Sequence, residues 1–208
     1  ESQIPIVFID RKHPGLEEFD SIMIDDVMGG YQATKHLTDL GHRKIGFIGD
    51  ITEVQTKPNN GNLKERNPFR FTSSKDRYEG YLKALAEVGV SPPPEYYGED
   101  YHGHIEAKTV ALKMLRLSQP PTAIFAASDT QAFGVIQATQ ELDMDIPTDL
   151  SIIGFDDVQA AEFMELTTIR QMLYRSGQLG VKRLLEKIDN PDSKTLQVNI
   201  PTEIIKRK

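Results

Sequence analysis

Short apolar runs alternate with amphipathic segments along most of the chain, and this alternation limits the folds open to it. Runs that predict buried strands lie at 4–10, 21–25, 44–49, 122–127 and 151–155. Segments with the periodicity of amphipathic helices lie at 26–40, 105–117, 130–142 and 174–188, and another begins near residue 75. Strands that alternate with helices in this way form βαβ units, whose strands run parallel. The sequence therefore predicts an α/β fold with parallel sheets flanked by helices.

Composition restricts the classes of protein to which the chain can belong. It has 208 residues, no cysteine and a net charge of −7. The lack of cysteine excludes disulfides and thiolate zinc sites, and it suits a reducing compartment such as the cytoplasm. A protein that holds duplex DNA by itself normally carries a basic surface, so we do not expect this acidic chain to grip DNA directly. No run of about 18 apolar residues occurs, so we expect no contact with a membrane interior.

The N-terminal stretch "ESQIPIVFIDRK" has no initiator Met and enters a predicted strand almost at once. It also lacks the basic and apolar regions of a signal peptide. We therefore expect a piece of a longer protein, and a processed mature chain is the alternative.

Polar residues follow four of the predicted strands, at the ends where parallel sheets bind ligands. They are Asp10, Asp50, the pair Ser128 and Asp129, and the pair Asp156 and Asp157. The carboxyl ends of parallel strands meet at one edge of a sheet, and ligands sit outside that edge. We call this edge the rim, and we predict a ligand site there.

The adjacent carboxylates of "IIGFDD" could form a polar turn, an acid–base or metal pair, or contacts to a ligand. Adjacent residues that leave a strand point to opposite sides, so the two should have different partners. Asp129 is expected to cap the helix at 130–142. Arg77 lies either on a solvated helix face or with its guanidinium toward the rim, where it could hold hydroxyls or a carboxylate.

Other chemical patterns give little support for catalysis. His102 and His104 flank one glycine and have no third ligand nearby, so we expect a solvated loop rather than a metal site. The sequence has neither a Gly-Lys-Ser/Thr phosphate loop nor a Gly-x-Ser-x-Gly elbow. We expect no enzyme activity, no metal and no cofactor. The segment 51–74 has no strand or helix period, and we expect a long loop that leaves the rim.

Seven stretches follow the order of one known protein family and cover nearly the whole chain. They are "IPIVFIDR", "DDVMGGYQATKHLTDLGHRKIGFIGD", "RYEGYLKAL", "PTAIFAASDTQAFGVIQATQEL", "IPTDLSIIGFDD", "LTTIRQ" and "IPTEIIKRK". This set resembles the effector-binding domain of the LacI/GalR family of bacterial transcription regulators. The most specific matches are "LGHRKIGFIG" and "DLSIIGFDD" with the following "LTTIRQ".

The resemblance implies a periplasmic-binding-protein-like fold of type I, with two α/β lobes and a ligand cleft between them. It implies that 1–21 and 166–208 form the remnant of an incomplete first lobe, and that 22–165 form a complete second lobe. We expect the incomplete lobe to expose apolar surface on the helix that carries Leu184, Leu185 and Ile188, which would favour association.

The resemblance also implies which residues contact the ligand: Asp10, Arg77, Tyr101, Ser128 and Asp156. It assigns Asp156 to ligand hydroxyls and Asp157 to holding the turn. The sequence departs from the family pattern at two of these regions. Ser128 stands where many members have Asn, and "MELTT" lacks the usual Pro-Pro before "LTT".

The resulting hypothesis is a cytoplasmic sensor that binds a small sugar or sugar-like metabolite between two lobes. Such a sensor controls DNA binding through a helix-turn-helix headpiece that is not in this chain, and it works as a homodimer. A sugar-binding protein of a transport system is the first alternative. An enzyme that uses the rim aspartates with Mg²⁺ is the second, and the lack of a Lys partner and of a facing acidic pair counts against it.

Overall fold

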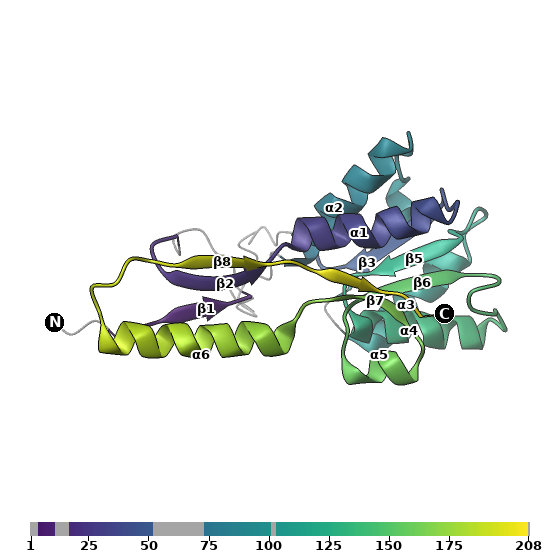
Figure 1. Cartoon of the computed structure of the whole chain (residues 1–208). Coiled ribbons are helices and arrows are strands. Elements are labelled where there is room, and N and C mark those ends of the chain that lie inside the picture. The colour runs from purple at the N-terminus through teal and green to yellow at the C-terminus, as the bar shows by residue number, and fades with distance from the viewer. Residues whose placement is uncertain (1–3, 11–16, 52–72, 101–102, 208) are drawn as a thin grey trace, which may run out of the picture.

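The computed structural model describes residues 4–10, 17–51, 73–100 and 103–207. Within these residues the strands form a larger and a smaller sheet, which lie end to end (Figure 1). Most of the segment 51–74 lies outside the described residues, so its expected role as a loop over the rim stays a prediction.

The larger sheet has six strands, which are parallel except at one edge. Their order is β4 (Tyr97–Glu99), β3 (Ile45–Gly49), β5 (Ala123–Ala126), β6 (Ser151–Asp156), β7 (Thr167–Arg170) and β9 (Glu203–Ile205). Only β9 runs antiparallel, against β7. The smaller sheet is parallel, in the order β1 (Val7–Ile9), β2 (Asp20–Ile24) and β8 (Gln197–Ile200).

Helices cover both faces of the larger sheet, as the all-apolar strands predict. One face carries α1 (Asp26–Asp39) and α2 (Ser73–Glu87), and the other carries α3 (His104–Leu115) and α4 (Asp129–Glu141) (Figure 1). Successive strand residues point to opposite faces: Phe47 packs in the cluster under α1 and α2, and Ile48 packs under α3 and α4. This alternation produces two separate apolar cores and confirms the predicted α/β class.

Three shorter or outlying elements complete the described fold. The 3₁₀ turn η1 (Pro94–Tyr96) precedes β4, and α5 (Gln159–Phe163) joins β6 to β7. The long helix α6 (Leu173–Asp189) lies beside the smaller sheet (Figure 1). No helix within the described ranges is long and apolar enough to cross a membrane.

The helices α1 and α2 cross at a pair of glycines. A Cβ atom on Gly30 would lie 2.1 Å from the carbonyl oxygen of Arg77, and one on Gly80 would lie 2.1 Å from that of Val27. Any side chain at either position would therefore force the two helices apart. This close crossing places the N-terminal turn of α2, including Arg77, directly over the start of α1.

The strand pairing differs from the sequence assignment of 1–21 and 166–208 to one lobe and 22–165 to the other. The whole of β2 lies in the smaller sheet, whereas β7 and β9 pair within the larger sheet. The resemblance implied these bounds, and neither it nor the apolar patterning shows which strands pair. With these strands reassigned, the division of the chain into two lobes stays a proposal.

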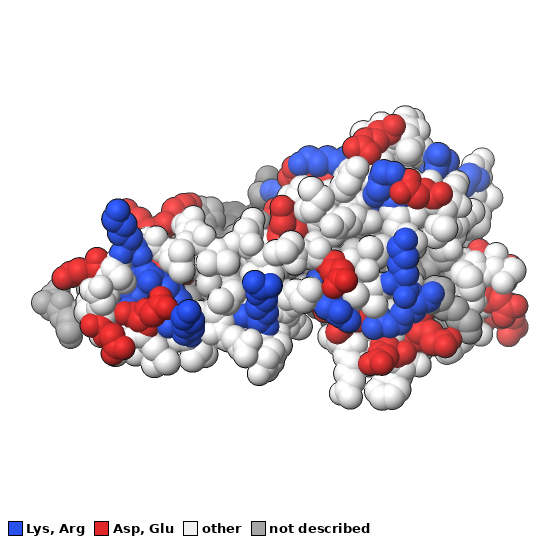
Figure 2. Space-filling view, viewed as in Figure 1, with Lys and Arg blue, Asp and Glu red and all other residues white. Residues whose placement is uncertain are grey.

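Acidic and basic side chains are interspersed on the face shown in Figure 2, without a continuous basic surface on that face. This distribution agrees with the net charge of −7. Nucleic acid binding by phosphate neutralisation requires a basic surface, which this face lacks.

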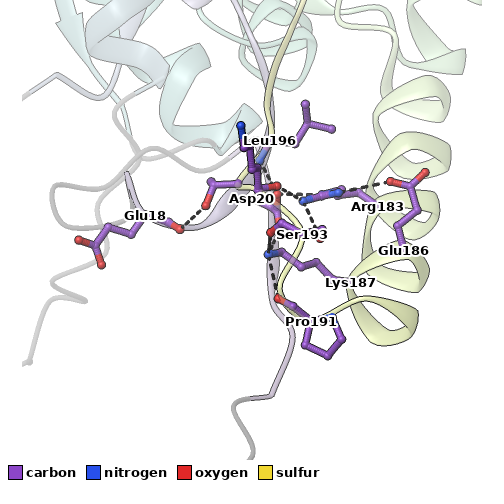
Figure 3. Close-up of polar contacts among 10 residues, drawn as sticks. Glu18, Asp20, Arg183, Glu186, Lys187, Pro191, Ser193 and Leu196 are labelled. Carbon is purple, nitrogen blue, oxygen red and sulfur yellow. Dashed lines mark hydrogen bonds and ion pairs between the residues drawn. The ribbon is translucent and has the colours of Figure 1, made fainter.

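A buried polar cluster fastens α6 to the smaller sheet (Figure 3). Asp20 on β2 is 2% exposed, and its Oδ1 accepts hydrogen bonds from Arg183 Nε at 2.8 Å and from the Leu196 amide at 2.6 Å. Lys187 Nζ lies 3.9 Å from Asp20 Oδ2 and also donates to the carbonyl of Ser193. One carboxylate thus joins β2, α6 and the segment that leads into β8.

We expect Asp20→Asn to lower the free energy of unfolding by roughly 3 kcal/mol, because it removes the buried counter-charge of Arg183 and leaves only Glu186, whose side chain is 47% exposed. Asp39→Asn is the matched control, since Asp39 pairs with Lys35 on the exposed surface of α1. Urea unfolding of both variants tests the expectation. Equal stability of the two variants would contradict it.

The face of α6 that points away from the smaller sheet is apolar and exposed. Tyr174 is 80% exposed, and Val181, Leu185 and Ile188 are each more than half exposed. Ser176, Gly180 and Arg183 form the buried side instead. Gly180 allows the close approach, because a Cβ there would lie 2.4 Å from Ile9. The expected exposure of Leu185 and Ile188 is confirmed.

Exposed apolar patches of this kind drive association, so we expect the chain to self-associate as its concentration rises. Leu185→Glu should shift the average mass toward the monomer. Ile105→Glu is the control, because Ile105 is an exposed aliphatic residue on another helix. Light scattering over a concentration series measures the effect, and a monomer at every concentration would refute the expectation.

Candidate functional site

The guanidinium of Arg77 lies at the rim and joins α2 to α1, to β6 and to the residue that follows β5. Its Nε donates to Asp26 Oδ1 at 2.8 Å, and its Nη1 donates to the carbonyl of Ala127 at 2.6 Å. Nη1 also lies 3.7 Å from Asp156 Oδ1, and the guanidinium carbon is 3.6 Å from the centre of the Phe155 ring. Arg77 is only 5% exposed. The prediction that its guanidinium points toward the rim is confirmed, and the alternative of a solvated helix face is wrong.

Asp156 ends β6 in a backbone conformation that side chains rarely adopt, with φ 120°. Its Oδ1 accepts a hydrogen bond from Gln171, which follows β7. The side chain is 22% exposed, whereas Arg77 and Asp26 beside it are nearly covered. Burial raises the pKa of Asp156 to about 7, although the charge of Arg77 acts to lower it. A carboxylate at the open edge of a buried network can accept hydrogen bonds from a ligand.

Asp157 turns to the opposite side and is held by two arginines. Its Oδ2 accepts from Arg170 Nε at 2.6 Å, and its Oδ1 accepts from Arg207 Nη2 at 2.7 Å. Burial acts to raise the pKa of Asp157, but the hydrogen bonds from Arg207 and Arg170 outweigh it and hold that pKa below its usual range. The expectation that the adjacent carboxylates have different partners is confirmed.

The capping role expected of Asp129 belongs to its neighbour Ser128. Ser128, not Asp129, caps α4: its Oγ accepts from the amide of Gln131 at 3.2 Å. Asp129 begins the helix one residue too late to cap it and turns into the protein. There it accepts from Thr168 Oγ1 at 2.6 Å and from the amide of Val158 at 2.9 Å.

The side chain of Asp129 is buried, and its charge acts on the pKa of Asp156 at the rim. Burial raises the pKa of Asp129 to about 6 against the lowering effect of its two hydrogen bonds. A Cβ at Gly154 would lie 2.3 Å from Asp129 Oδ1. The glycine of "IIGFDD" therefore makes room for this carboxyl group.

Two of the predicted ligand contacts, Asp10 and Tyr101, are not seen in the network around Arg77 among the described residues. Asp10 directly follows β1 of the smaller sheet, with φ 51° and its amide donating to the carbonyl of Ile22. Tyr101 and His102 lie outside the described residues. No group of three or more His, Asp or Glu side chains that could hold a metal occurs among the residues described. The ligand roles of Asp10, Arg77, Tyr101, Ser128 and Asp156 therefore stay proposals.

Comparison with known proteins adds a family to this geometry. The family model of the periplasmic binding protein-like domain matches residues 34–208. The chain belongs to the periplasmic binding protein-like domain family.

Relatives of this domain include two named repressors. The HTH-type transcriptional repressor PurR of Mannheimia succiniciproducens is 33% identical over an alignment of 210 positions, which covers 100% of this chain and 57% of that protein. The ribose operon repressor of Haemophilus influenzae is 37% identical over 192 residues, which are 91% and 52% of the two chains. The chain therefore spans about half the length of the curated relatives it matches.

A solved LacI family transcriptional regulator from Enterococcus faecium, with bound ribose, has a TM-score of 0.81 and 26% identity. The match covers 98% of this chain and 69% of that chain. These similarities confirm the resemblance to the effector-binding domain of LacI/GalR regulators and the periplasmic-binding-protein-like fold.

Sequence reasoning missed three residues of the network: Asp26, Gln171 and Arg207. Gln171 directly follows β7 and Asp26 comes two residues after the end of β2, so the same rule that selected Asp156 would have found them near carboxyl strand ends. Arg207 carried no such signal, because it follows β9. This strand runs antiparallel to β7, so its end lies beside the start of β7.

We expect Asp156→Asn and Asp157→Asn to change stability in opposite ways. The folded pKa of Asp156 lies above its ordinary value of 3.8, so ionisation between about pH 4 and pH 7 destabilises the fold. Asp156→Asn should therefore raise the melting temperature at pH 8 more than at pH 5. Asp157 has a lowered folded pKa, so its stabilising effect is present at both pH values and is lost only in stronger acid. Asp157→Asn should lower the melting temperature at both.

Thermal unfolding of the wild type and the two variants at both pH values tests this pair. An Asp156→Asn variant whose melting temperature differs from that of the wild type by the same amount at pH 5 and pH 8 would contradict the ionisation argument.

Proposed function

We propose that this chain is the effector-sensing part of a LacI-type transcription regulator. It binds a small sugar or sugar-like metabolite at the rim of the larger sheet, between two lobes. The observation that carries the proposal is the Asp156 carboxylate. It is partly exposed, lies 3.7 Å from the buried Arg77 and occupies the end of a central strand.

The chemistry of this site favours a ligand rich in hydroxyl groups. Above its pKa of about 7 the Asp156 carboxylate is ionised and only accepts hydrogen bonds, and sugar hydroxyls donate to it with charge assistance. Arg77 is already paired with Asp26, so it is a weaker partner for an anionic ligand than a guanidinium without a buried carboxylate. The ribose in the E. faecium structure is the kind of neutral, hydroxylated ligand that fits this description.

The whole protein would use this site to control DNA binding through a headpiece outside the chain. A ligand that prefers one arrangement of two lobes shifts the equilibrium toward that arrangement. In a cytoplasmic homodimer the shift would change the spacing of two headpieces. Names of the relatives as repressors support a regulator rather than an enzyme or a transport protein.

Calorimetric titration with ribose, followed by other neutral monosaccharides, tests the proposed site. Asp156→Asn should weaken sugar binding roughly 10- to 150-fold, the equivalent of one charge-assisted hydrogen bond of about 1.5–3 kcal/mol. Asp149→Asn is the control: Asp149 is an exposed aspartate near the opposite end of β6, and its carboxylate accepts from the amide of Asp145. Absence of binding by any sugar, or equal affinities of the two variants, would refute the proposal.

A further inference from the structure

The turn after β6 holds two successive residues in left-handed conformations without glycine. The φ angles are 120° at Asp156 and 57° at Asp157. A residue in such a conformation is strained, and the strain persists only where surrounding contacts determine the conformation. The contacts that fix this turn therefore also fix the direction of the Asp156 side chain.

Arg207 supplies a large share of those contacts. Its Nη2 donates to Asp157 Oδ1 at 2.7 Å, its Nη1 donates to the carbonyl of Leu166 at 2.8 Å, and its amide donates to Thr167 Oγ1 at 3.0 Å. The guanidinium fork thus bridges Asp157 to the residue that precedes β7. Asp157 is 7% exposed at its side chain and Arg207 16%, so water competes little with this pair.

The other contacts of the turn act in support. Arg170 Nε holds the second oxygen of Asp157, but its side chain is 40% exposed. Asp129 holds the amide of Val158 on the far side. Arg207 is consequently the more buried of the two cations that pull Asp157 away from the rim.

We infer that Arg207 is a positioning residue: through Asp157, it holds the Asp156 carboxylate toward Arg77 and the ligand. The ligand part of this inference rests on the proposed function. Arg207 itself belongs to the segment after β9, and it makes its contacts on the side of the turn opposite Arg77.

The position of Asp156 can be measured without a ligand. The charged groups that act on it are Arg77 from α2, which lowers its pKa, and Asp129 and Asp26, which raise it. If the carboxylate moves away from Arg77 while it stays buried, its pKa rises further. Nuclear magnetic resonance titration of ¹³C-labelled aspartate carboxyls, with the Asp156 signal identified by Asp156→Asn, reports this movement directly.

We expect Arg207→Ala to raise the pKa of Asp156 by about one unit, since an opposite charge nearby contributes about that much or more. Arg207→Lys keeps the charge but loses the fork that reaches both Asp157 and Leu166. It should shift the pKa in the same direction by at least half as much. Lys206→Ala removes the neighbouring, exposed charge and should leave the Asp156 titration unchanged.

A double-variant cycle tests whether the effect passes through Asp157. Asp157→Asn combined with Arg207→Ala should shift the pKa no further than the larger single variant does, because the two residues act as one unit. Ribose affinity should fall about tenfold in Arg207→Ala and stay within twofold in Lys206→Ala. Thermal melting establishes that each variant is folded at the temperature of measurement.

Four outcomes separate the inference from the proposed function. An Asp156 pKa that does not respond to Arg207→Ala overturns the inference, and so does Arg207→Lys with the wild-type titration, because through-space charge would then account for the effect. The expected pKa shifts together with weaker ribose binding support both ideas. If the variants show the expected pKa shifts but the wild-type protein binds no sugar, the positioning of Asp156 is supported and the proposed function is refuted.

Discussion

The buried guanidinium of Arg77 is the interaction on which the rim depends. It holds Asp26 at the start of α1, the carbonyl that follows β5, and the carboxylate that ends β6. Its place is set by the glycine crossing of α1 and α2, because no larger residue would let the two backbones meet. A packing constraint between two helices thus determines where the principal cation of the rim lies.

Around this cation, two neighbouring aspartates show how environment separates chemically identical groups. Burial raises the pKa of Asp156, which has one cation at 3.7 Å, whereas two close arginines lower that of Asp157. The first carboxylate gains little by ionising and remains available to a ligand. The second is committed to the fold. Their different duties follow from the alternation of side-chain direction along a strand and from the cations on each side.

The sequence predicted the elements of the fold better than their neighbours in space. Apolar runs and helical periods located β3, β5, β6, α1 and α4 closely, because burial imposes these periods directly. They could not show that β7 and β9 belong to the larger sheet, since pairing depends on contacts between distant segments.

At the rim, the strand-end rule found Asp156, but it could not predict the tertiary contacts that define the role of this residue. Capping preference predicted that Asp129 would be the N-cap of α4, but the adjacent Ser128 is the N-cap. Arg207 lies 50 residues from its partner Asp157, a separation that no local pattern spans.

Because α6 is long and begins beside the rim, a small rotation at the rim would move its far end by several ångströms. Gln171, which contacts Asp156, lies immediately before Met172, a residue in the left-handed conformation from which α6 begins. The 17 residues of α6 extend about 25 Å beyond this point, away from the larger sheet (Figure 1). A rotation of the chain beside the carboxylate would therefore displace the far end of α6 most. A rotation of about 10° there would carry its far end roughly 4 Å, nearly the rise of one helical turn.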